Sequence, residues 1–317
     1  MKNRTVLITG TTSGIGKAAA HIFAKNDCTL IMACRNMEKG REVLEEVKKA
    51  SGNEQVNLMQ LDVSSQMSVK NFCKVFKEKY NKLDNLIHNA AYFNHGSPYK
   101  LSEDNLEMTF ATNVFGPFLL TMLLRDLLKQ SDDARILHAG SNIIKHFFNP
   151  KLKINFSNLR GENPDDPAYK VYDYYRNSKM ALLMLSLKMS REFKADGIQV
   201  NCLQINGAQM SKSALQKVTP GYRMIAHIQN LFFPPTSFMA GIYYELSVSE
   251  RFKGMSGKLF NHKMEVMIPG KEKPGLPDII KQLAGSAIYP LYAENKVVQD
   301  ELWELCNSLT GVHSHQG

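Results

Sequence analysis

Short apolar runs alternate with longer helical patterns along the first two thirds of the chain. The apolar runs are rich in β-branched residues and lie at 5–9, 28–33, 56–61, 85–88, 135–139 and 198–203. The helical patterns lie at 15–25, 37–50, 67–80, 105–129 and 174–193. This alternation is typical of βαβ units, and runs without a polar face indicate strands that are covered on both sides. We therefore expect an α/β fold of the Rossmann type, with a doubly wound parallel sheet.

One domain can account for the whole chain. The 317 residues contain no repeat or linker, and hydrophobic residues make up 44% of them, which is enough for a core without disulfides. The five cysteines form no CxxC pair, which indicates a reducing compartment and disfavours a structural metal site. We find no signal-peptide pattern and no run of the ~18 apolar residues that a membrane span needs. We therefore expect a cytoplasmic protein.

The net charge of +9 comes from basic residues that are spread along the chain. Because no basic block is interleaved with aromatic residues, a solvated basic surface is favoured over nucleic-acid binding. The charge also suits an anionic cofactor and a peripheral approach to an anionic membrane. A homodimer is compatible with the sequence.

Three glycines separate the first predicted strand from the first predicted helix. Residues 9–16 read Thr-Gly-Thr-Thr-Ser-Gly-Ile-Gly, with the spacing GxxxGxG. Such glycines allow a tight turn, a close approach of the backbone to a pyrophosphate, and close packing of helix on strand. The free N–H groups at the helix start favour phosphate. A glycine-rich turn without a ligand is the alternative. The predicted cofactor contacts are Gly10, Thr12, Ser13, Gly14, Ile15 and Gly16.

Residues after the second and third strands indicate the type of nucleotide. Arg35 stands where an acidic residue would bind the ribose 2′-OH of NAD, and a guanidinium suits the 2′-phosphate of NADP instead. Lys17 either adds charge there or faces solvent. Asp62 is placed either to accept from the adenine amino group or to cap a turn. We expect the cofactor to be NADP(H).

A tyrosine and a lysine share one face of the helix predicted at 174–193. Tyr175 precedes Lys179 by four residues, and such a pair faces the same side of a helix. A phenol with a pKa of about 10 exchanges its proton poorly at neutral pH, and a nearby ammonium lowers that pKa. A surface pair would have the same spacing, and Tyr172 and Tyr174 lie close by.

Taken in order, these motifs resemble the short-chain dehydrogenase/reductase family. Asn89 after the fourth strand, Asn113 in a helix and Ser141 after the fifth strand complete the resemblance. It implies that Tyr175 is the acid/base and that Lys179 holds the nicotinamide ribose and tunes Tyr175. It further implies that Ser141 hydrogen-bonds the substrate oxygen and that Asn113 holds a water of the proton relay. Asn89 matches a family motif that steadies the sheet beside the cofactor.

Longer segments are similar to two branches of that family. Those similar to retinol dehydrogenases lie at 31–35, 110–120, 154–156, 256–260 and 302–303. Those similar to light-dependent protochlorophyllide reductases lie at 89–91, 140–141 and 231–235. Both branches use NADPH and bulky apolar substrates.

The sequence departs from the family pattern in three places. Residues 88–91 read His-Asn-Ala-Ala in place of Asn-Asn-Ala-Gly, and 140–141 read Gly-Ser in place of a double serine. After the sixth strand, 204–211 read Gln-Ile-Asn-Gly-Ala-Gln-Met-Ser where the family has Pro-Gly and a threonine. Either Asn206-Gly207 replaces Pro-Gly and Ser211 the threonine, or Ile205-Asn206 does and the hydroxyl is lost.

The last third of the chain is less regular. The segment 222–244 is rich in large apolar residues, and its first part has the pattern of an amphipathic helix. It is either a core-packing helix or, by its place in the family, a lid over a lipophilic substrate. A strand at 257–261, a Pro/Gly/Lys-rich loop at 268–276, a helix at 295–309 and a loose tail at 311–317 follow.

We therefore expect an NADP(H)-dependent oxidoreductase that reduces the carbonyl, or oxidises the alcohol, of a lipophilic substrate such as a retinoid, steroid or fatty aldehyde. One alternative is a C=C reductase of the protochlorophyllide reductase type. The other is a non-catalytic NADPH-binding regulator, which the altered residues at 205–207 favour. The presence of all four expected catalytic residues, Asn113, Ser141, Tyr175 and Lys179, disfavours it. No metal site is expected, because His138, His146 and His227 share no ligand spacing.

Overall fold

A computed structural model of the chain describes residues 4–93, 98–163, 165, 169–209, 224, 227–228, 230–284 and 287–312. Its centre is a parallel sheet in the order β3-β2-β1-β4-β5-β6-β7. The strands are β1 (Thr5–Thr9), β2 (Thr29–Cys34), β3 (Val56–Gln60), β4 (Asn85–His88), β5 (Arg135–Ser141), β6 (Gln199–Ile205) and β7 (Lys258–Phe260). This arrangement confirms the predicted Rossmann-type fold.

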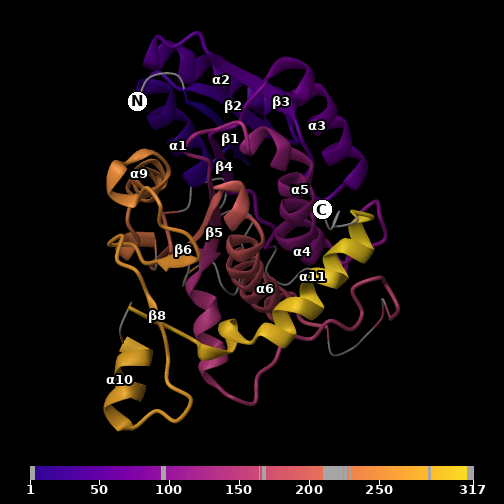
Figure 1. The fold of residues 1–317 in the computed structure, drawn as a ribbon, viewed down its shortest axis with the longest axis vertical. Coiled ribbons are helices and arrows are strands. Elements are labelled where there is room, and N and C mark those ends of the chain that lie inside the picture. Colours follow the sequence, from indigo (N-terminus) through magenta and orange to yellow (C-terminus); the bar gives the residue numbers. More distant parts are fainter. Residues whose placement is uncertain are drawn as a thin grey trace.

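Helices cover both faces of the sheet (Figure 1). The long ones are α1 (Gly14–Lys25), α2 (Met37–Ser51), α3 (Gln66–Lys79), α5 (Gly116–Leu128), α6 (Val171–Glu192), α9 (Thr236–Val248) and α11 (Lys296–Thr310). One core lies between the sheet and α1, α2 and α9, and the other between the sheet and α3, α5 and α6. The last helix, α11, packs outside α6. The strands are apolar on both sides because each side meets a helical layer.

The helix predicted at 105–129 has an irregular start. It consists of a short turn, α4 (Met108–Phe110), a π-helical turn, η1 (Ala111–Phe115), and then α5. A methyl group on Gly116 would lie 1.8 Å from the carbonyl oxygen of Val63, so only glycine lets the helix lie this close to the end of β3. A π-helical turn of this kind is frequent at functional sites.

The region predicted as a loop at 268–276 contains regular structure. Strand β8 (Ile268–Pro269) pairs in parallel with β9 (Ile288–Tyr289), and α10 (Leu276–Ala284) lies between them in the chain. This small unit extends away from the main sheet (Figure 1). The two strands have two residues each and lie far apart in the sequence, so neither produces a local sequence pattern.

The predicted lid at 222–244 divides into two parts. Residues 236–244 belong to α9, whose buried side chains are Met239, Ala240, Ile242, Tyr243, Leu246, Ser247 and Val248. This helix packs against α1, where the rings of Phe23 and Tyr244 lie 5.2 Å apart. For 236–244 the structure therefore takes the core-packing alternative rather than the lid, although Phe238 is 45% exposed. In the first part, Met224, Ile228, Leu231 and Phe232 are exposed.

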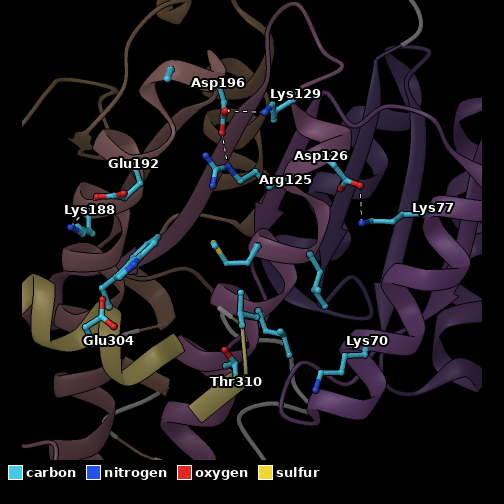
Figure 2. A pocket seen from close by; sticks show the side chains of 17 residues that line it. Lys70, Lys77, Arg125, Asp126, Lys129, Lys188, Glu192, Asp196, Glu304 and Thr310 are labelled. Carbon is cyan, nitrogen blue, oxygen red and sulfur yellow. Dashed lines mark hydrogen bonds and ion pairs between the residues drawn. The ribbon is translucent and has the colours of Figure 1, made fainter. Parts of the chain in front are cut away.

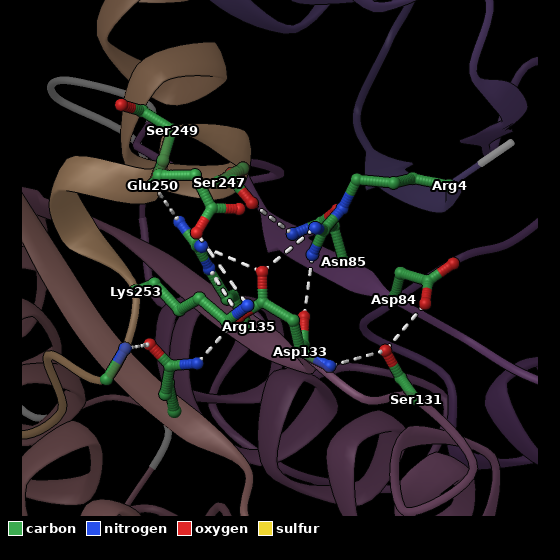
Figure 3. Close-up of polar contacts among 12 residues, drawn as sticks. Arg4, Asp84, Asn85, Ser131, Asp133, Arg135, Ser247, Ser249, Glu250 and Lys253 are labelled. Carbon is green, nitrogen blue, oxygen red and sulfur yellow. Dashed lines mark hydrogen bonds and ion pairs between the residues drawn. The ribbon is translucent and has the colours of Figure 1, made fainter. Parts of the chain in front are cut away.

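The amino ends of the strands are held by a polar network (Figure 3). Arg135 is 2% exposed, and its guanidinium donates to both carboxylate oxygens of Asp133 at 2.9 and 2.7 Å. The same guanidinium donates to the carbonyl of Ser249, after α9. Arg4, before β1, donates to Asp133 and to Asn85 of β4. The network thus ties three strands and α9 together at the edge opposite the carboxyl ends.

All five cysteines are buried and unpaired. They lie in different elements or next to them: Cys28, Cys34, Cys73, Cys202 and Cys306. Burial raises the pKa of the thiols of Cys28 and Cys73 to about 11 and about 12. Their chemistry is that of core residues.

Candidate active site

The strand order reverses between β1 and β4, and a crevice opens at their carboxyl ends. The glycine-rich turn follows β1, and Asn89 follows β4. Gly10 and Gly14 have φ values of +74° and +58°, which favour glycine. A methyl group on Gly16 would lie 2.3 Å from the carbonyl oxygen of Gly10. Such a crevice is the usual place for a nucleotide in open α/β sheets.

The amide of Asn89 holds the glycine-rich turn in place. Its Nδ2 donates to the carbonyls of Thr9 and Gly10 at 2.9 and 3.1 Å. The hydroxyl of Tyr243, on α9, donates to its Oδ1 at 3.2 Å. The sequence analysis missed Tyr243 as a site residue, since its apolar neighbours gave it the appearance of a lid residue.

Arg35 lies at the end of β2 with 72% of its side chain exposed. Its Nη1 is 3.6 Å from Oδ2 of Asp62. The other oxygen of Asp62 accepts from the backbone N–H of Ser64 at 2.9 Å, so Asp62 does cap a turn. Lys17 pairs with Glu46 at 2.6 Å and takes the solvent-facing alternative. Among these residues, Arg35 alone combines a positive charge with exposure at the end of β2.

Three of the four residues predicted for catalysis line one cleft of about 280 Å³, and Asn113 does not. Ser141 ends β5, while Tyr175 and Lys179 lie one turn apart on α6. The cleft is lined by Ile15, Asn89, Ala91, Ala139, Gly140, Ser141, Asn142, Tyr175, Lys179, Ile205, Asn206, Gly207 and Tyr243. It therefore joins the helix start at the glycine-rich turn to the predicted acid/base.

Burial dominates the electrostatics of the pair on α6. Nζ of Lys179 donates to the carbonyl of Ala139 at 2.8 Å, and burial lowers the pKa of Lys179 to about 8. Burial also raises the pKa of Tyr175, and its hydrogen bond with Ser141 lowers that pKa. Lys179 is not among the groups that shift the pKa of Tyr175, so the tuning of Tyr175 by Lys179 stays a prediction. The ammonium lies 5.8 Å from the centre of the Tyr175 ring, and it is itself desolvated.

Asn113 lies in the π-helical turn and is 1% exposed. Its Nδ2 donates to the carbonyl of Tyr92 and to the hydroxyl of Ser178, each at 3.0 Å. Its Oδ1 accepts from the N–H of Tyr92 at 2.7 Å. Ser178 in turn donates to the carbonyl of Tyr175. The amide therefore ties the chain after β4 to α6, and its role in holding a water stays a prediction.

The altered residues after β6 take up one of the two expected arrangements. Gly207 lines the cleft and has a φ of +143°, a conformation that is essentially confined to glycine. A methyl group there would lie 2.6 Å from the ring of Phe233. Asn206 is held by Gln204 and His262. The geometry favours Asn206-Gly207 as the counterpart of Pro-Gly, and Ser211 lies outside the described residues.

The three histidines named in the sequence analysis have different surroundings. His138 is buried and its ring stacks on His88 at 4.8 Å. His146 bonds the hydroxyl of Tyr172, and His227 is exposed. Within the described part of the chain, no three metal-ligating side chains lie together. Nor is any described helix both long and apolar enough to cross a membrane.

A larger hollow of about 1270 Å³ lies on another face, over α3, α5, α6 and α11 (Figure 2). Its charged groups largely neutralise one another: Lys77 pairs with Asp126, and Arg125 and Lys129 with Asp196. It contains no residue of the glycine-rich turn and none of the predicted catalytic residues. We therefore place the active site at the smaller cleft.

Comparisons with known proteins agree with this geometry. The profile of a family described as short chain dehydrogenase matches residues 4–148. The chain is 30% identical to human retinol dehydrogenase 13 over 273 residues, which are 81% of this chain and 76% of that protein. It is also 30% identical to the WW domain-containing oxidoreductase of Gallus gallus over 83% of this chain. That match spans only 62% of the Gallus gallus protein.

Solved structures share the fold. A protein from Mycobacterium paratuberculosis superposes with a TM-score of 0.66 at 21% identity, over 97% of this chain and 93% of that chain. A short chain dehydrogenase from Shigella flexneri, solved in complex with NADP, gives a TM-score of 0.64 at 20% identity. That superposition covers 83% of this chain and 98% of the Shigella flexneri chain.

Proposed function

The chain belongs to the short-chain dehydrogenase family, and from this premise we propose that it is an NADP(H)-dependent oxidoreductase acting on the carbonyl or alcohol of a lipophilic substrate. The observation that carries the proposal is that Ser141, Tyr175 and Lys179 line one cleft, which continues to the glycine-rich turn. When bound, the nicotinamide supplies or accepts the hydride. The protein supplies orientation and the proton.

The hydroxyl groups at the end of β5 and on α6 divide the work. Ser141 holds the substrate oxygen, and Tyr175 gives that oxygen a proton in the direction of reduction. A raised pKa keeps Tyr175 protonated at neutral pH, which is the form that an acid needs. Lys179 is anchored by the Ala139 carbonyl, so that its ammonium stays beneath Tyr175. We infer reduction as the favoured direction.

The choice of NADP(H) is supported by Arg35. Within the described residues, its exposed guanidinium at the end of β2 pairs only with Asp62, at 3.6 Å, and a 2′-phosphate would offer it a bidentate partner. Wild type should bind NADPH more tightly than NADH. Arg35→Asp should erase that preference by lowering the affinity for NADPH about ten- to a hundredfold. Lys17→Ala should leave the preference unchanged, because Lys17 pairs with Glu46. Equal affinity of wild type for the two cofactors would contradict the proposal.

The lipophilic substrate is supported by the apolar segment beside the cleft. Leu231 and Phe232 are 79% and 83% exposed, and a protein seldom leaves such residues bare without something to cover them. The next residue, Phe233, lies against Gly207 of the cleft. We propose that the exposed part covers a lipophilic substrate and contacts an anionic membrane surface. Several relatives are retinol dehydrogenases, which agrees with such a substrate.

The test is NADPH consumption with retinaldehyde, a steroid ketone, a fatty aldehyde and a quinone. Tyr175→Phe should fold, bind NADPH and lose turnover by about 10²–10⁴-fold. Tyr244→Phe, whose ring packs on Phe23 in the other core, is the matched control and should stay active. An active Tyr175→Phe would refute the assignment. Product analysis with an enone separates carbonyl from C=C reduction, and NADPH binding without any turnover would indicate a regulator.

A further inference from the structure

A second hydroxyl lies one helical turn before the predicted acid/base. Tyr172 precedes Tyr175 by three residues on α6, and such neighbours lie roughly 5–6 Å apart at their Cβ atoms on one face of a helix. Tyr172 is 40% exposed. Its phenol contributes to the raised pKa of Tyr175, so the two side chains are within electrostatic reach. The two phenols therefore lie near each other on one face of α6.

The hydroxyl of Tyr172 is held in place by a histidine. Nε2 of His146 lies 3.0 Å from the Tyr172 hydroxyl, and the two rings meet edge to face at 5.8 Å. His146 belongs to η2 (Asn142–Phe148), which begins directly after Ser141. A phenol and an imidazole joined by one hydrogen bond keep further donor and acceptor capacity. The pair is thus an oriented polar group that the proposed chemistry at Tyr175 does not use.

An aromatic ring lies beside both tyrosine rings. The ring of Phe93 is 4.4 Å from that of Tyr175 and 6.4 Å from that of Tyr172. Phe93 is 43% exposed and follows β4, whereas the other residues come from η2 and α6. The chain after β4, η2 and α6 therefore meet here. The apolar ring of Phe93 lies beside both the predicted acid/base and the His146–Tyr172 pair.

We propose that His146 and Tyr172 form a subsite that binds a second oxygen of the substrate. The substrate class is a carbonyl compound with a hydroxyl or carbonyl group on the far side of a flat apolar body, about one aromatic ring away from the reacting carbon. Phe93 contacts the body, Ser141 and Tyr175 hold the reacting oxygen, and the His146–Tyr172 pair holds the distal oxygen. This inference rests on the proposed function and narrows its substrate.

A matched pair of aldehydes tests the subsite. 4-(Hydroxymethyl)benzaldehyde and 4-ethylbenzaldehyde have nearly the same shape and differ only in a hydroxyl group that takes the place of a methyl group. The measurement is the ratio of their kcat/KM values with NADPH. Wild type should favour the hydroxymethyl compound, and Tyr172→Phe should lower the ratio about three- to tenfold, the range of one hydrogen bond. His146→Leu should lower it too, and the double variant should be no worse than Tyr172→Phe alone.

Tyr244→Phe is the control and should leave the ratio unchanged. An equal fall for both aldehydes in Tyr172→Phe would show that Tyr172 acts on Tyr175 rather than on substrate, which overturns the subsite. A ratio that no variant changes would overturn it as well.

Binding without turnover separates this inference from the proposed function. Benzene-1,4-dimethanol and 4-ethylbenzyl alcohol are titrated calorimetrically into the NADPH-loaded protein. A preference for the diol that depends on Tyr172 supports the subsite even where no aldehyde is reduced, in which case the proposed function fails alone. Equal binding of the two alcohols, in a protein that reduces both aldehydes, overturns the subsite alone.

Discussion

Gly16 and Gly14 lie two residues apart, yet replacing each by alanine should damage different properties. A methyl group on Gly16 would lie 2.3 Å from the Gly10 carbonyl oxygen and 2.4 Å from Nδ2 of Asn89. Apart from its chain neighbours and its own helical turn, a methyl group on Gly14 would have no atom of the described residues within 4 Å. The first change therefore acts on the fold, and the second acts on the space in which we place the cofactor phosphates.

The cost of Gly16→Ala follows from two contributions. Forcing a methyl group into a filled site costs about 1–3 kcal/mol. Displacing Asn89 breaks its bonds to Thr9 and Gly10, each of which contributes about 0.5–1.5 kcal/mol. The free energy of unfolding should therefore fall by about 2–6 kcal/mol. Gly14→Ala introduces a side chain at a φ of +58°, which costs about 1–2 kcal/mol.

Urea denaturation followed by circular dichroism measures the stability of both variants, and calorimetry measures their affinity for NADPH. Gly14→Ala should be the more stable of the two variants. Its affinity for NADPH should nevertheless fall, by more than its small loss of stability explains. Equal stability of Gly16→Ala and Gly14→Ala would refute the packing argument. Unchanged NADPH affinity of a folded Gly14→Ala would refute the placement of the phosphates.

The remaining predictions concern the polar edge, the buried lysine and the apolar segment. Arg135→Met should lower the free energy of unfolding by about 1–3 kcal/mol, because the Asp133 carboxylate loses its bidentate partner but keeps its bonds from Arg4 and Gln199; an unchanged free energy of unfolding in urea denaturation would contradict this. Burial lowers the pKa of Lys179 from 10.5 to about 8, so between these values the unfolded chain binds more protons and stability rises with pH, by up to about 3 kcal/mol. Lys179→Met should lose this rise when the two proteins are compared at pH 7.5 and pH 10, and an identical pH dependence would speak against it. Phe232→Ser should weaken sedimentation with anionic vesicles and leave the thermal midpoint unchanged; a lower midpoint with undiminished vesicle binding would show that Phe232 belongs to the core.

The sequence predicts the strands and the long helices well, because each apolar run is buried by a helical layer on both faces. It predicts less where tertiary contacts decide the structure. The π-helical turn at 111–115 carries no pattern of its own, and β8 and β9 are two residues each. Helix α9 shows the same limit, since an apolar segment that packs on α1 has the composition of a lid.

For the site, the helical spacing of Tyr175 and Lys179 and the family resemblance at Ser141 were sufficient to predict the three residues that line the cleft. Electrostatics could not be predicted in the same way. Burial is the largest influence on the pKa of Tyr175, and the four-residue spacing to Lys179 does not reveal it. Tyr243, which reaches Asn89 from α9, has no neighbouring motif that would reveal it.

The five buried thiols make the molecule its own reporter of local opening. A thiol reagent reaches a buried cysteine only when the surrounding element opens. Cys34 lies in β2, Cys73 in α3, Cys202 in β6 and Cys306 in α11, so labelling resolved by peptide mass spectrometry would follow four regions in one sample without any engineered probe. If the sheet opens as a unit, Cys34 and Cys202 will be labelled at one rate, while Cys306 in the outermost helix will be labelled first.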